Sequence, residues 1–346
     1  MKKTFRIKVV IVFSFTLTFL VLSEIILRVK GSYKTYTEKI KNVYSCTYEQ
    51  TLPYFHLHNP GSEFVLDHTD FKYLYSINKI GIREVDFNKT KQTRTKRILC
   101  FGDSFTEGVG APYDSSYVRA LERQLKIKST DFEVYNCAVS GSDPFYNYVL
   151  LKEKMMEYNP DIVTFTINTS DLTDFIFTGG SDRFIGDKVV ARKKPFFEPL
   201  FHYSHLARFI IIKILGYEWT LLNKNDNIKM LTNGVEEYLK LFIYINEMCE
   251  TKGVDFLLII QPHPDDILFP DGMYKYLVSV KANLFKNKIK FIDLLPPLAE
   301  VINNNNIYHY SWKTDGHYNS SGYQILGEKI VSETEKKYPD FWVNKN

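Results

Sequence analysis

The chain has 346 residues, 45% of them hydrophobic and 24% charged, a composition that supports a large buried core and excludes a disordered protein. Its formal net charge of +4 arises at the N-terminus, where the first eight residues include no acid and four bases: Lys2, Lys3, Arg6 and Lys8. Because basic and acidic residues balance from Val9 onward, the body has no basic footprint and we expect no nucleic-acid partner.

Residues 1–8 are predicted to be a cytoplasmic tail and residues 9–27 a transmembrane anchor. The segment is apolar apart from a few hydroxyl groups and Glu24, and about 19 helical residues nearly span a hydrocarbon core. The basic flank predicts a single-pass protein whose body is exported to the periplasmic or extracellular side. The alternative is a cleaved signal peptide with its site at Val21-Leu22-Ser23, although the apolar run continues to Leu27.

Residues 28–94 are mixed in composition and rich in Tyr, Lys and Asn, with a turn signal at Asn59-Pro60-Gly61-Ser62. We expect this segment to be a stalk or an N-terminal cover over the main domain.

The four cysteines show no disulfide framework and no metal-ligand spacing; Cys100 and Cys137 lie in apolar runs where cysteine is a small core residue. We therefore expect no cofactor and no metal.

Residues 95–346 alternate between strand and helix patterns, which predicts an α/β domain with a five-stranded parallel sheet. The nearly continuous apolar runs are typical of strands that are buried on both faces. The expected strands are 97–101, 132–137, 161–167, 255–260 and 289–292, and the expected helices are 117–126, 146–157, 235–251, 272–285 and 320–337.

A long aromatic segment, residues 175–233, separates the third and fourth expected strands. An ordinary crossover is much shorter, so we interpret this segment as an insertion near the face that carries the chemistry. Two hypotheses are open: a helical pair that extends the core, or a cap that shapes a substrate cleft.

The first expected strand ends in Gly102-Asp103-Ser104, a tight turn that opens a helix. Such a turn places the Ser104 hydroxyl at the carboxyl end of a parallel strand, where α/β folds hold their active sites. A serine is a weak nucleophile until a neighbouring base takes its proton. Far along the chain, Asp315 and His317 provide an acid and a base, and an extended segment would direct both side chains to one face. The sequence thus predicts Ser104 as nucleophile, His317 as base and Asp315 as its orienting carboxylate.

The same chemistry requires donors for the oxyanion of the tetrahedral intermediate. We expect the backbone N–H of Ser104 and that of Gly141, which follows the second strand, to supply two. A third donor should come from the end of the third strand, where Asn168-Thr169-Ser170-Asp171 lies.

The chain resembles the SGNH, or GDSL-type, hydrolases, and in particular their membrane-anchored bacterial branch. Three blocks carry the resemblance: Gly102-Asp103-Ser104, Gly141, and the terminal block Asp315-Gly316-His317 in its Asp-x-His form. The stretch 78–83, Asn-Lys-Ile-Gly-Ile-Arg, is similar to that branch as well. The resemblance covers residues 75–174 and 230–337 and implies a flavodoxin-like three-layer αβα sandwich.

The third family block, Gly-x-Asn-Asp, is altered in this chain. Alignment from Asp161 places Asn168 at the glycine and Ser170 at the asparagine whose amide completes the oxyanion hole in the family. The resemblance therefore implies Ser170 as the third donor, with Asn168 as the alternative after a small change of register.

Three functions remain open. The first is a serine esterase that removes O-acyl groups, acetyl foremost, from an envelope or extracellular glycan or another small ester. The second is an O-acyltransferase that passes the acyl group from the same serine to a surface polysaccharide. The third is a catalytically weak glycan-binding or assembly protein on the same fold. His263, in a Pro-His-Pro-Asp-Asp run after the fourth strand, is expected to have a role in the cleft or in its loop rather than to bind a metal with Asp265 and Asp266.

Overall fold

The structure, a computed structural model, describes residues 2–34, 40–43, 49–52, 55–129, 131–180, 184–185, 188–189, 194–219 and 221–343. The chain divides into two compact units. One, the helical unit, comprises Met1–Lys41 and Lys193–Lys229; the other, the sheet unit, comprises Asn42–Arg192 and Met230–Asn346. The expectation for Cys46 lies outside the described residues.

The sheet unit is built on five parallel strands in the order β12-β11-β8-β6-β7. Their bounds are β6 Lys96–Phe101, β7 Phe132–Asn136, β8 Ile162–Ile167, β11 Asp255–Ile260 and β12 Phe291–Asp293. All residues of β6 and β8 are buried, as expected of central strands that are covered on both faces. The predicted five-stranded parallel sheet is confirmed.

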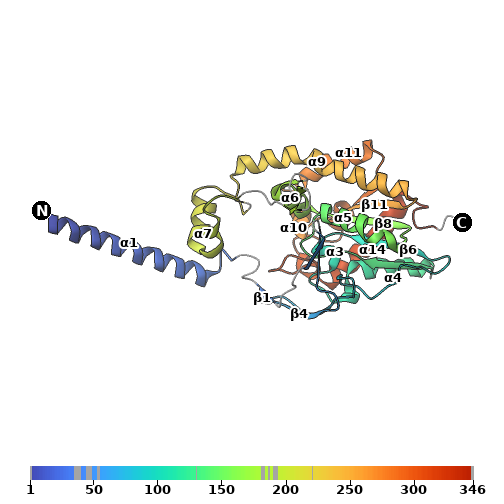
Figure 1. Ribbon diagram of the computed structural model, residues 1–346, viewed down its shortest axis with the longest axis horizontal. Helices are drawn as coiled ribbons and strands as arrows, with labels where there is room; N and C mark the ends of the chain where they lie inside the picture. Colours follow the sequence, from blue (N-terminus) through green and yellow to red (C-terminus); the bar gives the residue numbers. More distant parts are fainter. Residues whose placement is uncertain are drawn as a thin grey trace. The chain divides into compact units, whose positions relative to one another are not determined.

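Helices cover both faces of this sheet and make the three layers that the family resemblance implied (Figure 1). Because side chains alternate along a strand, Leu99 and Phe101 of β6 join one core while Ile98 and Cys100 join the other. The first core is closed by α5 Pro144–Glu153, α6 Thr169–Thr178, α9 Lys224–Thr251 and α11 Lys275–Lys286. The second is closed by α4 Tyr117–Lys128, α12 Leu295–Ala299 and α14 Ser320–Lys337.

Short elements connect these layers. They are α3 Ser104–Glu107, α10 Pro264–Leu268, α13 Ile307–Tyr310, the 3₁₀ turns Tyr113–Ser115 and Met155–Tyr158, and the strands β9 Phe184–Ile185 and β10 Lys188–Val189, which pair antiparallel.

The N-terminal segment adds short strands: β1 Ile40–Val43, β2 Glu49–Leu52, β3 Phe55–Leu57, β4 Glu63–His68 and β5 Lys72–Ser76. β4 and β5 form a hairpin, and β2 pairs with β3. Several side chains after β3 are almost fully buried, namely His58, His68, Tyr75, Ile82 and Arg83. This part of the segment therefore packs as a cover on the sheet unit.

The helical unit contains α1 Lys2–Lys30, α7 Glu198–Tyr203, α8 His205–Phe209 and a π-helical turn Ile210–Ile214. Within the described part of the chain, α1 is the one helix long and apolar enough to cross a membrane; its span Thr4–Lys30 contains an 18-residue window with mean hydropathy 2.4. Residues 193–229, the larger part of the expected insertion, group with α1 and have their own small core of Phe201, Ile211 and Leu221.

Candidate active site

Ser104 is the first residue of α3, directly after β6. The turn is tight because Gly102 approaches its surroundings closely: a Cβ there would lie 2.0 Å from Thr106 Oγ1 and 3.1 Å from the Thr166 carbonyl oxygen. Asp103 caps α3, since its Oδ1 accepts the N–H of Phe105 at 2.9 Å. A structural role for Asp103 accords with this contact, and the turn presents the Ser104 side chain at the carboxyl edge of the sheet.

The structure brings together the three residues for which the sequence predicts a catalytic role. Ser104 Oγ lies 2.7 Å from His317 Nε2, and His317 Nδ1 lies 2.5 Å from Asp315 Oδ1. Burial raises the pKa of Asp315, but the hydrogen bond and positive charge of His317, with His68 nearby, outweigh it and hold that pKa below its usual value. An ionised Asp315 can keep the imidazole proton on Nδ1, which leaves Nε2 free to accept the serine proton.

The local backbone at Asp315 differs from the extended segment expected from the sequence. Residues 313–315 form a turn, and Gly316 has a φ of +90°, in the left-handed region that favours glycine. This reversal lets Asp315 Oδ1 accept both the N–H of His317, at 3.2 Å, and its ring nitrogen. A tight turn, rather than strand alternation, therefore aligns the acid with the base.

Two residues of the β4–β5 hairpin support this turn, and no spacing pattern in the chain points to either of them. Asp70 Oδ2 accepts the backbone N–H groups of Thr314 and Asp315 at 2.8 and 2.9 Å, across 244 residues of sequence. Buried His68 places its Nε2 4.0 Å from Asp315 Oδ2. The N-terminal cover thus fixes the position of the carboxylate that orients His317.

A second contact from the cover reaches the loop that holds Gly141. His58 Nε2 and Glu107 Oε1 lie 2.6 Å apart, and Glu107 Oε2 accepts the N–H of Ser140 at 2.6 Å. Burial raises the pKa of Glu107, but His58, Arg83 and the bond from Ser140 together lower it below the usual value. Glu107 lies one helical turn after Ser104, a spacing that could have identified it as a support for the site.

Gly141 lies at an exposed turn with a φ of +78° and open space where a Cβ would project. Among the contacts of the described residues, neither its N–H nor that of Ser104 has an acceptor. Both groups are therefore free of other hydrogen-bond acceptors among the described residues.

Neither Asn168 nor Ser170, the candidates for the third donor, presents a free side-chain amide. Asn168 is fully buried and donates from Nδ2 to Asp103 Oδ2 at 3.0 Å, while its Oδ1 accepts the Ser170 hydroxyl at 2.6 Å. Asn168 therefore links the third strand to the Asp103 turn and caps α6. Ser170 is partly exposed, and its hydroxyl can rotate toward a ligand.

We expect Ser170→Asn to raise kcat, by up to about 10²-fold, because an amide reaches farther than a hydroxyl toward the developing oxyanion. Initial rates on a small acetyl ester measure the effect, with Ser170→Ala as the control that removes the hydroxyl. An unchanged kcat in both variants would indicate an oxyanion hole of two backbone donors.

A cavity of about 350 Å³ adjoins this end of the sheet. Its lining combines hydroxyl, carboxylate and aromatic groups, among them Ser170, Thr173, His263, Asp265, Asp266 and Phe269. Phe105 lies between this cavity and the predicted triad of Ser104, His317 and Asp315. Its ring centroid is 4.5 Å from the ring centroids of both His263 and His317. Within the described residues no three His, Cys, Asp or Glu side chains form a metal-binding group.

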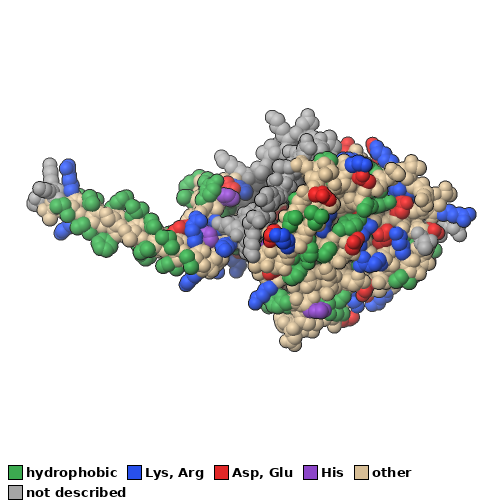
Figure 2. All heavy atoms as spheres, turned by 90° about the horizontal axis from the view of Figure 1, so that it is seen from below, with side chains coloured by type: hydrophobic (Ala, Val, Ile, Leu, Met, Phe, Trp, Pro, Cys, Tyr) green, Lys and Arg blue, Asp and Glu red, His purple; other side chains and the backbone are tan. Residues whose placement is uncertain are grey.

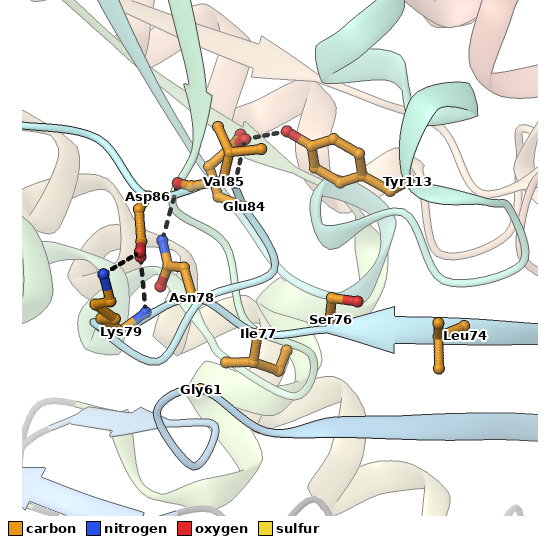
Figure 3. Close-up of a pocket in the computed structure, with 10 residues that line it drawn as sticks. All are labelled: Gly61, Leu74, Ser76, Ile77, Asn78, Lys79, Glu84, Val85, Asp86 and Tyr113. Atoms are coloured by element: carbon orange, nitrogen blue, oxygen red, sulfur yellow. Dashed lines mark hydrogen bonds and ion pairs between the residues drawn. The ribbon is translucent and has the colours of Figure 1, made fainter.

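A second cavity, of about 410 Å³, lies between β5 and Tyr113 and contains none of the triad residues (Figure 3). The polar side chains that line this cavity bond to one another: Tyr113 hydrogen-bonds Glu84, and Lys79 pairs with Asp86. Burial raises the pKa of Glu84, although Arg119 and several hydrogen bonds oppose the shift. Neither cavity is lined by Ser104, His317 or Asp315, but the first one contains His263, whose ring contacts Phe105 beside His317.

His263 predicts a specific pH dependence of stability. Burial, and the charge of His317, lower its pKa from 6.5 to about 4. Between these values the unfolded chain binds the proton and the folded chain does not, so stability falls as the pH drops through this window, by about 3 kcal/mol at most. We expect His263→Gln to lose less stability than the parent between about pH 7 and pH 4.5, measured by thermal unfolding in detergent. Equal losses would contradict the assignment.

Residues 98–207 match the family described as GDSL-like Lipase/Acylhydrolase, a region that includes Ser104, Gly141 and Ser170 and ends before Asp315. No curated protein sequence matches the chain.

Among solved structures, an acetyl xylan esterase is 16% identical (TM-score 0.43, covering 68% of this chain and 98% of the other). A lipase from a goat rumen metagenome is 17% identical (TM-score 0.45, 69% and 97%). A lipase/acylhydrolase from Enterococcus faecalis is also 17% identical (TM-score 0.41, 70% and 97%).

Proposed function

We propose that this chain, whose residues 98–207 match the GDSL-like Lipase/Acylhydrolase family, is a serine hydrolase that removes O-acyl groups, acetyl foremost, from an envelope or extracellular glycan. The observation that carries the proposal is the hydrogen-bonded series Ser104–His317–Asp315, at 2.7 and 2.5 Å. A serine, a base within hydrogen-bond reach and a carboxylate that orients the base form the arrangement that acyl transfer through serine requires.

The proposed reaction has two halves. His317 Nε2 takes the Ser104 proton as Oγ bonds to the acyl carbon, and the resulting oxyanion accepts hydrogen bonds from the N–H groups of Ser104 and Gly141. When the intermediate collapses, the bond from the acyl carbon to the sugar oxygen breaks, and that oxygen takes the proton from His317. Water then loses a proton to His317 and attacks the acyl-enzyme, which releases the carboxylic acid and restores Ser104.

The cavity beside Ser170 supports a second candidate, an O-acyltransferase. It offers the hydroxyl groups of Thr173 and Ser170, the carboxylates of Asp265 and Asp266, and the exposed ring of Phe269, groups suited to a polyol. A sugar hydroxyl seated there would replace water in the second half of the reaction. Hydrolase and transferase share the acyl-enzyme and differ only in the acceptor.

The proposed location is a membrane, with α1 retained as a single-pass anchor and the sheet unit on the exported side. Its support is the length and hydropathy of α1 and the basic residues that precede the apolar run.

The test uses the full chain in detergent, treated with a fluorophosphonate probe and mapped by mass spectrometry. We expect labelling at Ser104 and none in Ser104→Ala. Absence of labelling in the folded parent would refute the proposal and favour the non-catalytic, glycan-binding interpretation. Incubation with an acetylated oligosaccharide, with and without a second glycan, then separates the two enzymes: free acetate indicates the esterase and an acetylated acceptor the transferase.

A further inference from the structure

The helical unit exposes an apolar surface that its own core does not account for. Six large apolar or aromatic side chains within residues 194–219 are each more than half exposed: Phe196, Leu200, Tyr203, Ile214, Leu215 and Trp219. We call them the apolar face. A concentration of this kind on one short segment marks an interaction site. Figure 2 shows hydrophobic side chains along α1 and a further group of them beside its C-terminal end.

The segment that carries the apolar face is bound to the end of α1 by charged groups. Glu24 of α1 accepts hydrogen bonds from Ser204 Oγ and the Leu206 N–H, both at 2.8 Å, so it binds the N-terminus of α8. Arg28, one turn farther along α1, donates from Nη2 to the Tyr203 carbonyl oxygen at 2.6 Å. These bonds fix the position of α7 and α8 along the axis of α1.

A fully buried cation strengthens the same junction. Arg208 of α8 donates to the carbonyl oxygens of Phe201 and His202, at 2.8 and 2.9 Å, and also to that of Tyr33, just beyond α1. The rings of Tyr33 and Phe209 meet edge to face at 5.7 Å. Residues 24–33 and 201–209 therefore form one packed structure, and the depth of α1 in a bilayer sets the depth of the apolar face.

With α1 spanning a bilayer as proposed above, this junction falls at the membrane interface. The apolar span of α1 is unburied, and it ends in Glu24 and Arg28, groups that avoid the hydrocarbon centre. Basic residues Arg28, Lys30 and Lys34 follow at the same end, where anionic headgroups attract them. Tyr203 and Trp219 are of the residue types that concentrate at the headgroup level.

We propose that the apolar face lies in the outer leaflet interface beside α1 and binds lipid. The helices α7 and α8 then act as an interfacial platform, with their apolar side chains entering the boundary between headgroups and acyl chains. The occupant is lipid rather than a second copy of the chain, because the segment that carries the face is bonded to the end of α1, whose own apolar side chains are unburied. The proposal goes beyond the reaction and rests on the proposed retention of α1 as an anchor.

Depth measurements by spin labelling test this proposal on the full chain in phosphatidylethanolamine–phosphatidylglycerol vesicles. Every labelled protein also carries Cys46→Ser, so that the label attaches only at the introduced cysteine. Cys100, Cys137 and Cys249 are kept, because they are buried and do not react with the label. Labels are placed singly by Phe196→Cys, by Leu17→Cys in the middle of α1, and by Phe285→Cys, a matched control 78% exposed on α11 of the sheet unit. Collisions with oxygen and with a water-soluble nickel complex report the depth of each label.

We expect the label at 196 to lie about 5–10 Å below the headgroup boundary, while that at 285 remains in water. A water-exposed label at 196 with a lipid-embedded label at 17 overturns the platform and leaves the anchor intact. A label at 196 shielded from both reagents shows that protein covers the face and also overturns the proposal. If the label at 17 is itself in water, the anchor fails and the platform with it.

Discussion

Replacing Ser104 with alanine is expected to lower kcat for ester hydrolysis by on the order of 10⁴–10⁶-fold, because the acyl-enzyme then has no oxygen on which to form. His317→Ala should cost a similar factor, since His317 Nε2, 2.7 Å away, is the only base in contact with the Ser104 hydroxyl among the described residues. Release of acetate from a simple acetyl ester by the full chain in detergent measures both.

The losses of kcat caused by Ser104→Ala and His317→Ala should not be additive. Residues that act as one unit lose their joint contribution once, so the double variant should be no slower than either single variant. Ser332→Ala, which removes a surface hydroxyl on α14, is the matched control and should keep the parent rate. A Ser104→Ala variant within ten-fold of the parent would mean that another group carries the reaction.

Asp315→Asn is expected to lower kcat by about 10⁴-fold without disturbing the fold. The side-chain amide would donate to His317 Nδ1, so the imidazole proton would move to Nε2, the atom that must accept the serine proton. Because the pKa of Asp315 lies below its usual value, the carboxylate stays ionised as the pH falls toward 4. We therefore expect that any fall in kcat between neutral pH and pH 4 does not come from protonation of Asp315.

Asp70→Asn provides the control for this prediction. Its amide oxygen can still accept the N–H groups of Thr314 and Asp315, so the turn should persist and kcat should change little. Equal losses in the two variants would show that support of the turn, rather than the tautomer of His317, limits the rate.

The central sheet could be predicted because its strands are encoded locally. β8 and β11 are continuous apolar runs between turn signals, and their observed bounds fall within one residue of those expected. The family resemblance, confirmed by the match over residues 98–207, follows from the short block around Ser104 that ends such a strand. The strand and the turn after it are both short-range features.

Features that depend on packing could not be predicted in this way. α9 begins at Lys224, well before the expected start at 235, and Gly234 lies inside it, where a Cβ would lie 2.6 Å from Ile176 Cγ1. The close approach of the helix to Ile176 that this glycine permits is a packing feature with no local signal. Likewise, no periodicity relates residues 194–219 to Glu24, because a carboxylate at a helix N-terminus is a tertiary contact.

The hairpin that holds Asp70 and His68 has a consequence for transplanting this active centre. The matched region begins at residue 98, yet the turn of Asp315 is held from β4 and β5, and Glu107 is held by His58. A chimaera joined at residue 95 would keep Ser104, His317 and Asp315 and lose all three supports. A fragment fused to a different membrane anchor must therefore start before Leu57. The cover is thus part of the smallest fragment that would retain the supported active site.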